Sequence, residues 1–178
     1  MPKRELIPNF LMTTKYIANP HLLNGFKYDL RVFALVTSYS PLKIYLYNDC
    51  LVRFCTEKYS VEQVTANNRF AHLTSYSVNK KNKSPQINPL QDLNKLKEAY
   101  EMEGIDFEPI HAQIKDLVVK TLISAEAHIA GNSDEYPTAR NACYEEFSFD
   151  IMLDDKLRAW LTKTSKTESV GYTANLLQ

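Results

Sequence analysis

Four charged residues in the first third of the sequence have the types and spacing to bind an anion. Lys27, Asp29 and Arg31 alternate with apolar residues, so in a β-strand their side chains share one face of the sheet. Arg53 lies in a later apolar stretch, and its guanidinium suits bidentate recognition of phosphate or carboxylate. The same alternation also fits a solvated edge strand, and a lone arginine in a strand is often a surface residue. The other face of the first strand would be packed, with the side chains of Phe26, Tyr28, Leu30, Val32, Ala34 and Val36.

Three consecutive strands within residues 24–59 are predicted to position this charged face. The first strand ends before a turn at residues 38–41, whose serines and proline favour tight turns. A second strand is expected over residues 42–48 and a third over residues 51–56, which gives an antiparallel meander. In this arrangement Arg53 returns beside the charged face of the first strand.

The rest of the chain supplies helices and one more hairpin. Residues 90–103 have apolar side chains at helical spacing and end at Gly104, and residues 110–130 carry the same pattern over a longer stretch. Residues 147–153 alternate again and, after a turn, residues 158–161 would return as a second strand. The sequence therefore predicts an α+β fold, mainly antiparallel sheet with two or more packed helices.

Composition argues against several classes of function. The 178 residues include 21 basic and 21 acidic side chains, and no basic run is long enough for a general nucleic-acid or membrane footprint. No segment resembles a signal peptide, and no apolar run approaches the ~20 residues needed to span a bilayer. Cys50, Cys55 and Cys143 show no zinc-like spacing. We expect one soluble domain in a reducing cytosol, with neither nucleic acid nor membrane as a partner.

The sequence contains the long block FKYDLRVFALVTSYSPLKIYLYNDCLVRFCTEKYS, with KYIANPHLLNG before it and HLTSYSVNKKN after it. This block resembles the tubulin–tyrosine ligase-like family, and its polyglutamylase branch most closely. The resemblance implies the C-terminal part of an ATP-grasp fold, in which antiparallel sheet holds ATP and Mg²⁺. An acceptor carboxylate is activated there as an acyl phosphate, which the amine of an incoming amino acid attacks.

The resemblance also implies a division of the chain and a cellular setting. Residues 1–14 would be a tail or the remnant of a longer segment, residues 15–162 a partial ATP-grasp domain, and residues 163–178 a polar tail. The implied reaction joins glutamate to glutamate side chains of tubulin, so the expected partners are tubulin C-terminal tails or microtubules and free glutamate. The expected location is the cytoplasm and its microtubule cytoskeleton, with a cilium or basal body included.

The same resemblance assigns roles to individual residues. Lys27, Arg31 and Arg53 would be catalytic, because cations neutralise phosphate or carboxylate oxygens as charge builds in the transition state. Asp150 would bind the metal. Nucleotide binding would fall to the hinge residues Lys15, Tyr16 and Ile17, and to Lys27, Asp29 and Thr74.

The sequence departs from the family pattern at the metal. The return strand of the last hairpin should carry a glutamate and an asparagine, and those positions hold Lys163 and Ser165. Mg²⁺ prefers oxygen ligands, which a lysine does not supply. Replacing a carboxylate by an ammonium also inverts the charge beside the metal position. Only fourteen residues precede the hinge, and we expect no glycine-rich loop over the phosphates. The chain alone is therefore predicted to be weak or inactive as a ligase.

Two other hypotheses fit the same residues. The chain could be a non-catalytic module that binds tubulin tails through Lys80, Lys81 and Lys83, together with the patch of Lys27, Arg31 and Arg53. The three lysines lie in a polar loop that also fits a simple solvated surface. It could also be a truncated gene product.

Overall fold

The computed structural model describes residues 14–39, 41–61, 68–133 and 145–166. The described residues form an antiparallel sheet with the strand order β4-β3-β2-β5-β6, and β1 pairs with the start of β2. The strands are β1 Leu22–Leu23, β2 Phe26–Tyr39, β3 Leu42–Phe54, β4 Leu90–Gln91, β5 Glu145–Leu153 and β6 Ala159–Lys166. The helices are α1 Arg69–His72, α2 Tyr76–Asn79, α3 Leu93–Met102 and α4 Phe107–Ser133. This arrangement confirms the predicted α+β class.

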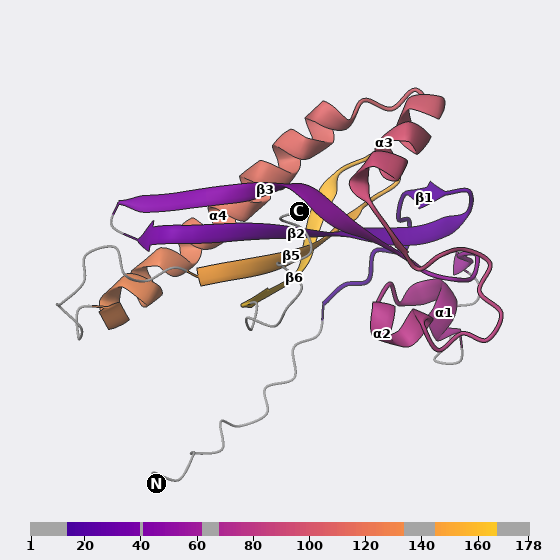
Figure 1. Ribbon diagram of the computed structural model, residues 1–178, viewed down its shortest axis with the longest axis horizontal. Helices are drawn as coiled ribbons and strands as arrows, with labels where there is room; N and C mark the ends of the chain where they lie inside the picture. The colour runs from indigo at the N-terminus through magenta and orange to yellow at the C-terminus, as the bar shows by residue number, and fades with distance from the viewer. Residues whose placement is uncertain (1–13, 40, 62–67, 134–144, 167–178) are drawn as a thin grey trace, which may run out of the picture.

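The two longest strands, β2 and β3, form a hairpin (Figure 1). The prediction of separate strands over residues 42–48 and 51–56 is wrong, because β3 is continuous through both. A register shift absorbs the polar residues between them: Val32 pairs with Cys50, but Ala34 already pairs with Leu46. Such a bulge bends a strand without ending it. The Asp49 side chain supports the bulged segment by accepting a hydrogen bond from the backbone N–H of Cys50 at 2.8 Å.

The alternating pattern of β2 correctly identifies its packed face. Every apolar side chain predicted to share that face, from Phe26 to Val36, is buried in the main hydrophobic cluster. The strand is not a solvated edge, because β3 and β5 pair with its two sides. The charged face of β2 is therefore held in the middle of the sheet.

Helix α4 covers the packed face of the sheet and contacts β2, β3 and β6 (Figure 1). Its buried residues are spaced by four, as an amphipathic helix requires: Ile110, Ile114, Val118 and Leu122. Asp92 caps the N-terminus of helix α3, where its carboxylate accepts from the Lys95 N–H at 2.9 Å. The helix ends shortly before Gly104, which has a φ of +72°. The predicted helix at 90–103 is confirmed, although its first two positions form the short strand β4.

The last hairpin is also confirmed, with β5 and β6 paired antiparallel. Strand β6 continues to Lys166, so Lys163 and Ser165 lie within the sheet, past the predicted end of the domain at residue 162. Most of the predicted tails at 1–14 and 163–178 lies outside the described residues, and the division of the chain stays a prediction. Among the described residues, no helix combines the length and apolar character needed to cross a bilayer.

Candidate active site

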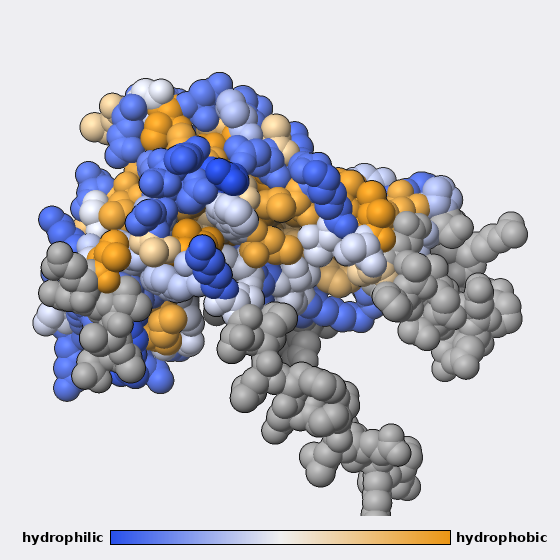
Figure 2. Space-filling view, turned by 180° about the vertical axis from the view of Figure 1, so that it is seen from behind, coloured by the Kyte–Doolittle hydropathy of each residue, from blue (hydrophilic) through white to orange (hydrophobic). Residues whose placement is uncertain are grey.

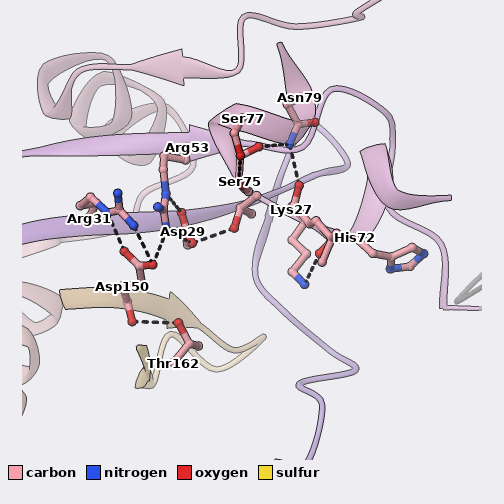
Figure 3. Close-up of polar contacts among 12 residues, drawn as sticks. Lys27, Asp29, Arg31, Arg53, His72, Ser75, Ser77, Asn79, Asp150 and Thr162 are labelled. Atoms are coloured by element: carbon pink, nitrogen blue, oxygen red, sulfur yellow. Dashed lines mark hydrogen bonds and ion pairs between the residues drawn. The ribbon is translucent and has the colours of Figure 1, made fainter. Parts of the chain in front are cut away.

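Strand register brings four of the predicted site residues onto one face of the sheet. Asp29 on β2 pairs with Arg53 on β3, and Arg31 on β2 pairs with Asp150 on β5. Directly opposed residues of an antiparallel pair point to the same side. Figure 3 shows the four side chains together, although Asp150 is more than 90 residues from the other three in sequence.

These four side chains form one chain of ion pairs, which we call the Arg–Asp network. Arg31 donates to both oxygens of Asp150, from Nε at 2.8 Å and from Nη2 at 3.0 Å. Arg53 donates to both oxygens of Asp29, at 2.7 Å and 2.5 Å, and its Nη2 also lies 3.0 Å from Asp150 Oδ2. Two guanidinium groups and two carboxylates therefore balance their charges within hydrogen-bonding distance.

The network is largely removed from water, which strengthens its electrostatics. Asp29, Arg53 and Asp150 are 3%, 6% and 7% exposed. Burial alone would raise the pKa of Asp150, but hydrogen bonds from Arg31 and the charge and hydrogen bond of Arg53 outweigh it and lower that pKa. Burial alone would lower the pKa of Arg53, but its partners Asp29 and Asp150 raise it. Asp150 and Arg53 are therefore stabilised in their charged forms. Arg31, whose side chain is 31% exposed, is the member of the network most open to solvent.

Lys27 lies on the same face of β2 but belongs to a separate group. Its ammonium donates to the Tyr16 hydroxyl and to the main-chain oxygen of His72, both at 2.9 Å, and it lies 4.5 Å from the centre of the Tyr16 ring. Only 2% of the residue is exposed, and this burial lowers the pKa of Lys27, although Cys55 and Asp29 oppose the shift. Figure 3 shows Lys27 beside His72 and away from the Arg–Asp network.

The segment after α1 connects the two groups. Thr74 donates its hydroxyl hydrogen bond to Asp29 Oδ2 at 2.7 Å, so it orients the carboxylate that holds Arg53. His72 is buried, as a structural histidine would be, and its Nδ1 lies 3.1 Å from the Tyr16 hydroxyl. Thr74 therefore contacts the network directly, whereas the predicted nucleotide role of this threonine stays a prediction.

The predicted hinge residues differ in what they contact. Lys15 is exposed and Ile17 is partly buried, whereas the Tyr16 side chain caps Lys27. The contact of the Tyr16 side chain with Lys27 was not predicted from the sequence. Nor was the role of Asn79, which is 1% exposed and accepts hydrogen bonds from both the backbone N–H and the hydroxyl of Thr56. Neither residue has a sequence pattern that distinguishes it from an ordinary surface polar residue.

The predicted metal position around Asp150 does not have the ligands that Mg²⁺ requires. Asp150 pairs across the sheet with Lys163, and Ser148 pairs with Ser165, so no second carboxylate faces Asp150 from β6. Both oxygens of Asp150 already accept from arginines. Within the described ranges, no group of three histidine, cysteine, aspartate or glutamate side chains could hold a metal ion. Mg²⁺ takes hard oxygen ligands, so this set of side chains does not fit it.

Comparison with known proteins finds relatives that modify tubulin. Mouse tubulin monoglutamylase TTLL4 is 40% identical over 178 residues, covering 96% of this chain but 15% of the mouse protein. Mouse tubulin polyglutamylase TTLL5 is 35% identical and covers 98% of this chain, and the Xenopus tropicalis tubulin polyglutamylase TTLL7 is 38% identical and covers 90%. The chain spans only 14% and 19% of the lengths of these last two proteins.

The family model for tubulin-tyrosine ligases matches residues 8–163. That range includes β2, β3 and β5, which carry the Arg–Asp network, and it reaches Lys163 on β6. On this match, the chain belongs to the tubulin-tyrosine ligase family.

Proposed function

We propose that this chain is part of the ligase domain of a tubulin glutamylase, the part that receives anionic reactants on one face of the sheet. The proposed reaction joins the amine of glutamate to a side-chain carboxylate of a tubulin glutamate, with ATP supplying the free energy. Relatives named as tubulin monoglutamylase and polyglutamylases, together with the family match, support this proposal. Tubulin tails and glutamate are the proposed partners, in a microtubule setting.

Three cationic side chains, those of Arg31, Arg53 and Lys27, are proposed to bind the anionic reactants. Arg31 is the most accessible, so an incoming phosphate or carboxylate would reach it first and would compete with Asp150 for its donors. Arg53 is held in a fixed orientation by Asp29, and Thr74 holds Asp29 in turn. A preorganised cation costs little reorganisation when negative charge develops on the reactant. Lys27 would serve the nucleotide side of the site, where Tyr16 joins it to the hinge segment.

We further propose that the 178-residue chain on its own is inactive or nearly so. The observation that carries this proposal is the cross-strand pair of Asp150 and Lys163. Exchanging a carboxylate for an ammonium at that point changes the local charge by about two units, which opposes a dication. Lysine can contact a phosphate, but it cannot bridge two phosphates as a metal ion does.

The test is incorporation of radiolabelled glutamate into microtubules by the purified chain with Mg-ATP. We expect incorporation no higher than that of the Asp150→Ala variant, and well below that of mouse TTLL4 assayed in parallel. Incorporation clearly above the Asp150→Ala control would contradict the proposed inactivity. A double variant, Lys163→Glu with Ser165→Asn, tests the reason: if these positions limit activity, the double variant gains incorporation over the unmodified chain.

A further inference from the structure

A polar cluster lies inside the molecule, on the side of the sheet opposite to the Arg–Asp network. His21 precedes β1, Tyr28 belongs to β2 and Tyr100 belongs to α3. The His21 Nδ1 lies 2.8 Å from the Tyr28 hydroxyl, which in turn lies 2.5 Å from the Tyr100 hydroxyl. The His21 Nε2 faces the Glu103 carboxylate at 3.8 Å. We call these four residues the His21 cluster.

Burial shields the cluster from water. Tyr28 and Tyr100 are 2% and 0% exposed, and the His21 side chain is 14% exposed. The His21 ring contacts both tyrosine rings edge-on, with centroids 5.9 Å apart in each case. Figure 2 shows a continuous surface of mixed hydrophilic and hydrophobic side chains at its upper left, where α3 lies. Water therefore has little access to replace a hydrogen bond that the cluster loses.

Glu103 sets the direction of the hydrogen bonds in the cluster. A neutral imidazole has one N–H donor and one acceptor nitrogen. The carboxylate favours the proton on the Nε2 that faces it, so Nδ1 is left to accept from the Tyr28 hydroxyl. Tyr28 then accepts from the Tyr100 hydroxyl. While His21 is neutral, both buried hydroxyls therefore have an acceptor for their hydrogen.

Protonation of His21 breaks this arrangement. Both ring nitrogens of the cation are donors, so Nδ1 can no longer accept from Tyr28. The Tyr28 hydroxyl would have to turn its hydrogen towards Tyr100, and Tyr100 would have to turn its own hydrogen away into an interior with little water. A buried donor that loses its acceptor keeps its full desolvation cost. The cluster is therefore less stable with a protonated His21.

The charged surroundings only partly favour the protonated ring. The titratable groups around His21 are Tyr28 on β2, Tyr100 and Glu103 on α3, and Asp154, which pairs with Pro20 and forms an ion pair with Arg158. Burial raises the pKa of both tyrosines, so their hydroxyls keep their hydrogens. Burial also lowers the pKa of His21, and the charge of Glu103 opposes this shift without cancelling it.

The lowered pKa of His21 fixes the direction of the pH dependence. Its neutral form stabilises the fold above the ordinary histidine pKa of about 6.5. This stability is lost as the pH falls from the ordinary value through the lowered one. Mild acid should therefore weaken the contacts that the His21 cluster makes.

The cluster is attached to the strand that carries the charged face. Tyr28 lies between Lys27 and Asp29 in β2, and alternate side chains of a strand point to opposite faces. The backbone N–H of His21 donates to the Leu153 oxygen at 2.9 Å, which ties the segment before β1 to β5. The cluster therefore joins α3 to the back of β2, directly behind Lys27 and Asp29.

We propose that the His21 cluster is a pH-sensitive latch, which holds α3 against β2 while His21 is neutral and releases it when His21 is protonated. Release loosens the backbone of β2 behind Lys27 and Asp29, so the order of the charged face depends on pH. The latch does not rest on the proposed function, because no reactant takes part in it.

The experiment is hydrogen–deuterium exchange of the full 178-residue chain at about pH 7.5 and about pH 5, on either side of the ordinary histidine pKa, with rates corrected for the intrinsic effect of pH. The test variant is His21→Gln, whose amide oxygen can accept from Tyr28 but whose side chain does not titrate. The matched control is His111→Gln, which removes a histidine of α4 whose pKa is also lowered by burial.

The expected readout is the protection of the α3 amides. Between the two pH values it should fall at least about fivefold in the unmodified chain and at least about threefold in His111→Gln. In His21→Gln it should fall less than about twofold, because the group that titrates is gone. The inference is overturned if His21→Gln keeps the full pH dependence, or if α3 protection is unchanged while His21 becomes protonated.

Proton NMR titration of the His21 ring gives a readout that a merely structural histidine would not move. The pKa of His21 should lie below the ordinary value of about 6.5. In Tyr28→Phe the pKa should rise, because the hydroxyl that favours the neutral ring is removed. A pKa at or above the ordinary value in the unmodified chain, or an unchanged pKa in Tyr28→Phe, overturns the latch. Circular dichroism checks the folding of the variants, and if His21→Gln does not fold, the two titrations decide.

Discussion

The buried pair of Asp29 and Arg53 gives the sharpest test of the network. Replacing Asp29 with Asn keeps the size of the side chain but removes the charge that faces Arg53. The two side chains are only 4% and 8% exposed, so water cannot replace the lost partner. Breaking a buried pair from one side costs about 3–5 kcal/mol. Asp150 still lies 3.0 Å from Arg53, so we expect a loss of about 3 kcal/mol, near the low end of that range.

The measurement is urea unfolding, followed by a thermal scan. For a domain of this size, a loss of about 3 kcal/mol lowers the Tm by about 6–12 °C. Asp116→Asn is the matched control, because Asp116 forms an ion pair with Lys120 at 2.6 Å in which both side chains are more than half exposed. Removing that exposed charge should cost less than about 0.5 kcal/mol.

A double-mutant cycle separates the charge from other effects of the substitution. Adding Arg53→Met to Asp29→Asn removes the unpaired guanidinium, so the double variant should be more stable than the sum of the two single losses by at least about 1 kcal/mol. The reasoning is refuted if Asp29→Asn is as mild as Asp116→Asn, or if the two losses simply add.

Three further predictions follow from the same geometry. Because the pKa of Asp150 is lowered in the folded state, its ionised form stabilises the fold above the ordinary carboxyl pKa, and this stability is lost as the pH falls through the lowered value. As the pH is lowered below about 4, the urea midpoint of Asp150→Asn should therefore fall less steeply than that of the unmodified chain. Lys163→Glu should raise the affinity for Mn²⁺ in calorimetric titration, and an unchanged affinity would argue against a metal position between β5 and β6. Tyr28→Phe removes the hydroxyl that lies 2.5 Å from Tyr100 and should cost about 1–2 kcal/mol in urea unfolding, whereas Tyr45→Phe, at a residue 59% exposed, should be nearly neutral.

The closed geometry of the network bears on how the proposed site could work. In this structure both oxygens of Asp150 are engaged by arginines, and the positive charges of Arg31 and Arg53 are already compensated. An anionic reactant that binds Arg31 must therefore offset the loss of an ion pair. If Arg31 turned from Asp150 to such a reactant, Lys163 is the cation that lies opposite Asp150 on β6.

Much of the fold could be predicted because it depends on local periodicity. Alternation in β2 identified the buried face, and four-residue spacing identified α4, since each pattern reflects which side chains a regular element can bury together. The break expected near Asn48 and Asp49 was wrong for a physical reason: a bulge accommodated polar residues that would otherwise end a strand. Local composition does not reveal whether a neighbouring strand can absorb such a bulge.

The sequence by itself determined the class of the fold, the charged face of β2 and the similarity to a ligase family, because all three depend on the order of residues along short stretches. Only the tertiary structure decided that Arg31 binds Asp150 across 119 positions of sequence and that Tyr16 covers Lys27. It also placed Lys163 opposite Asp150, through a register shift beside Thr162. Those outcomes depend on strand register and on packing between distant segments, and a shift of one residue would turn each side chain to the other face.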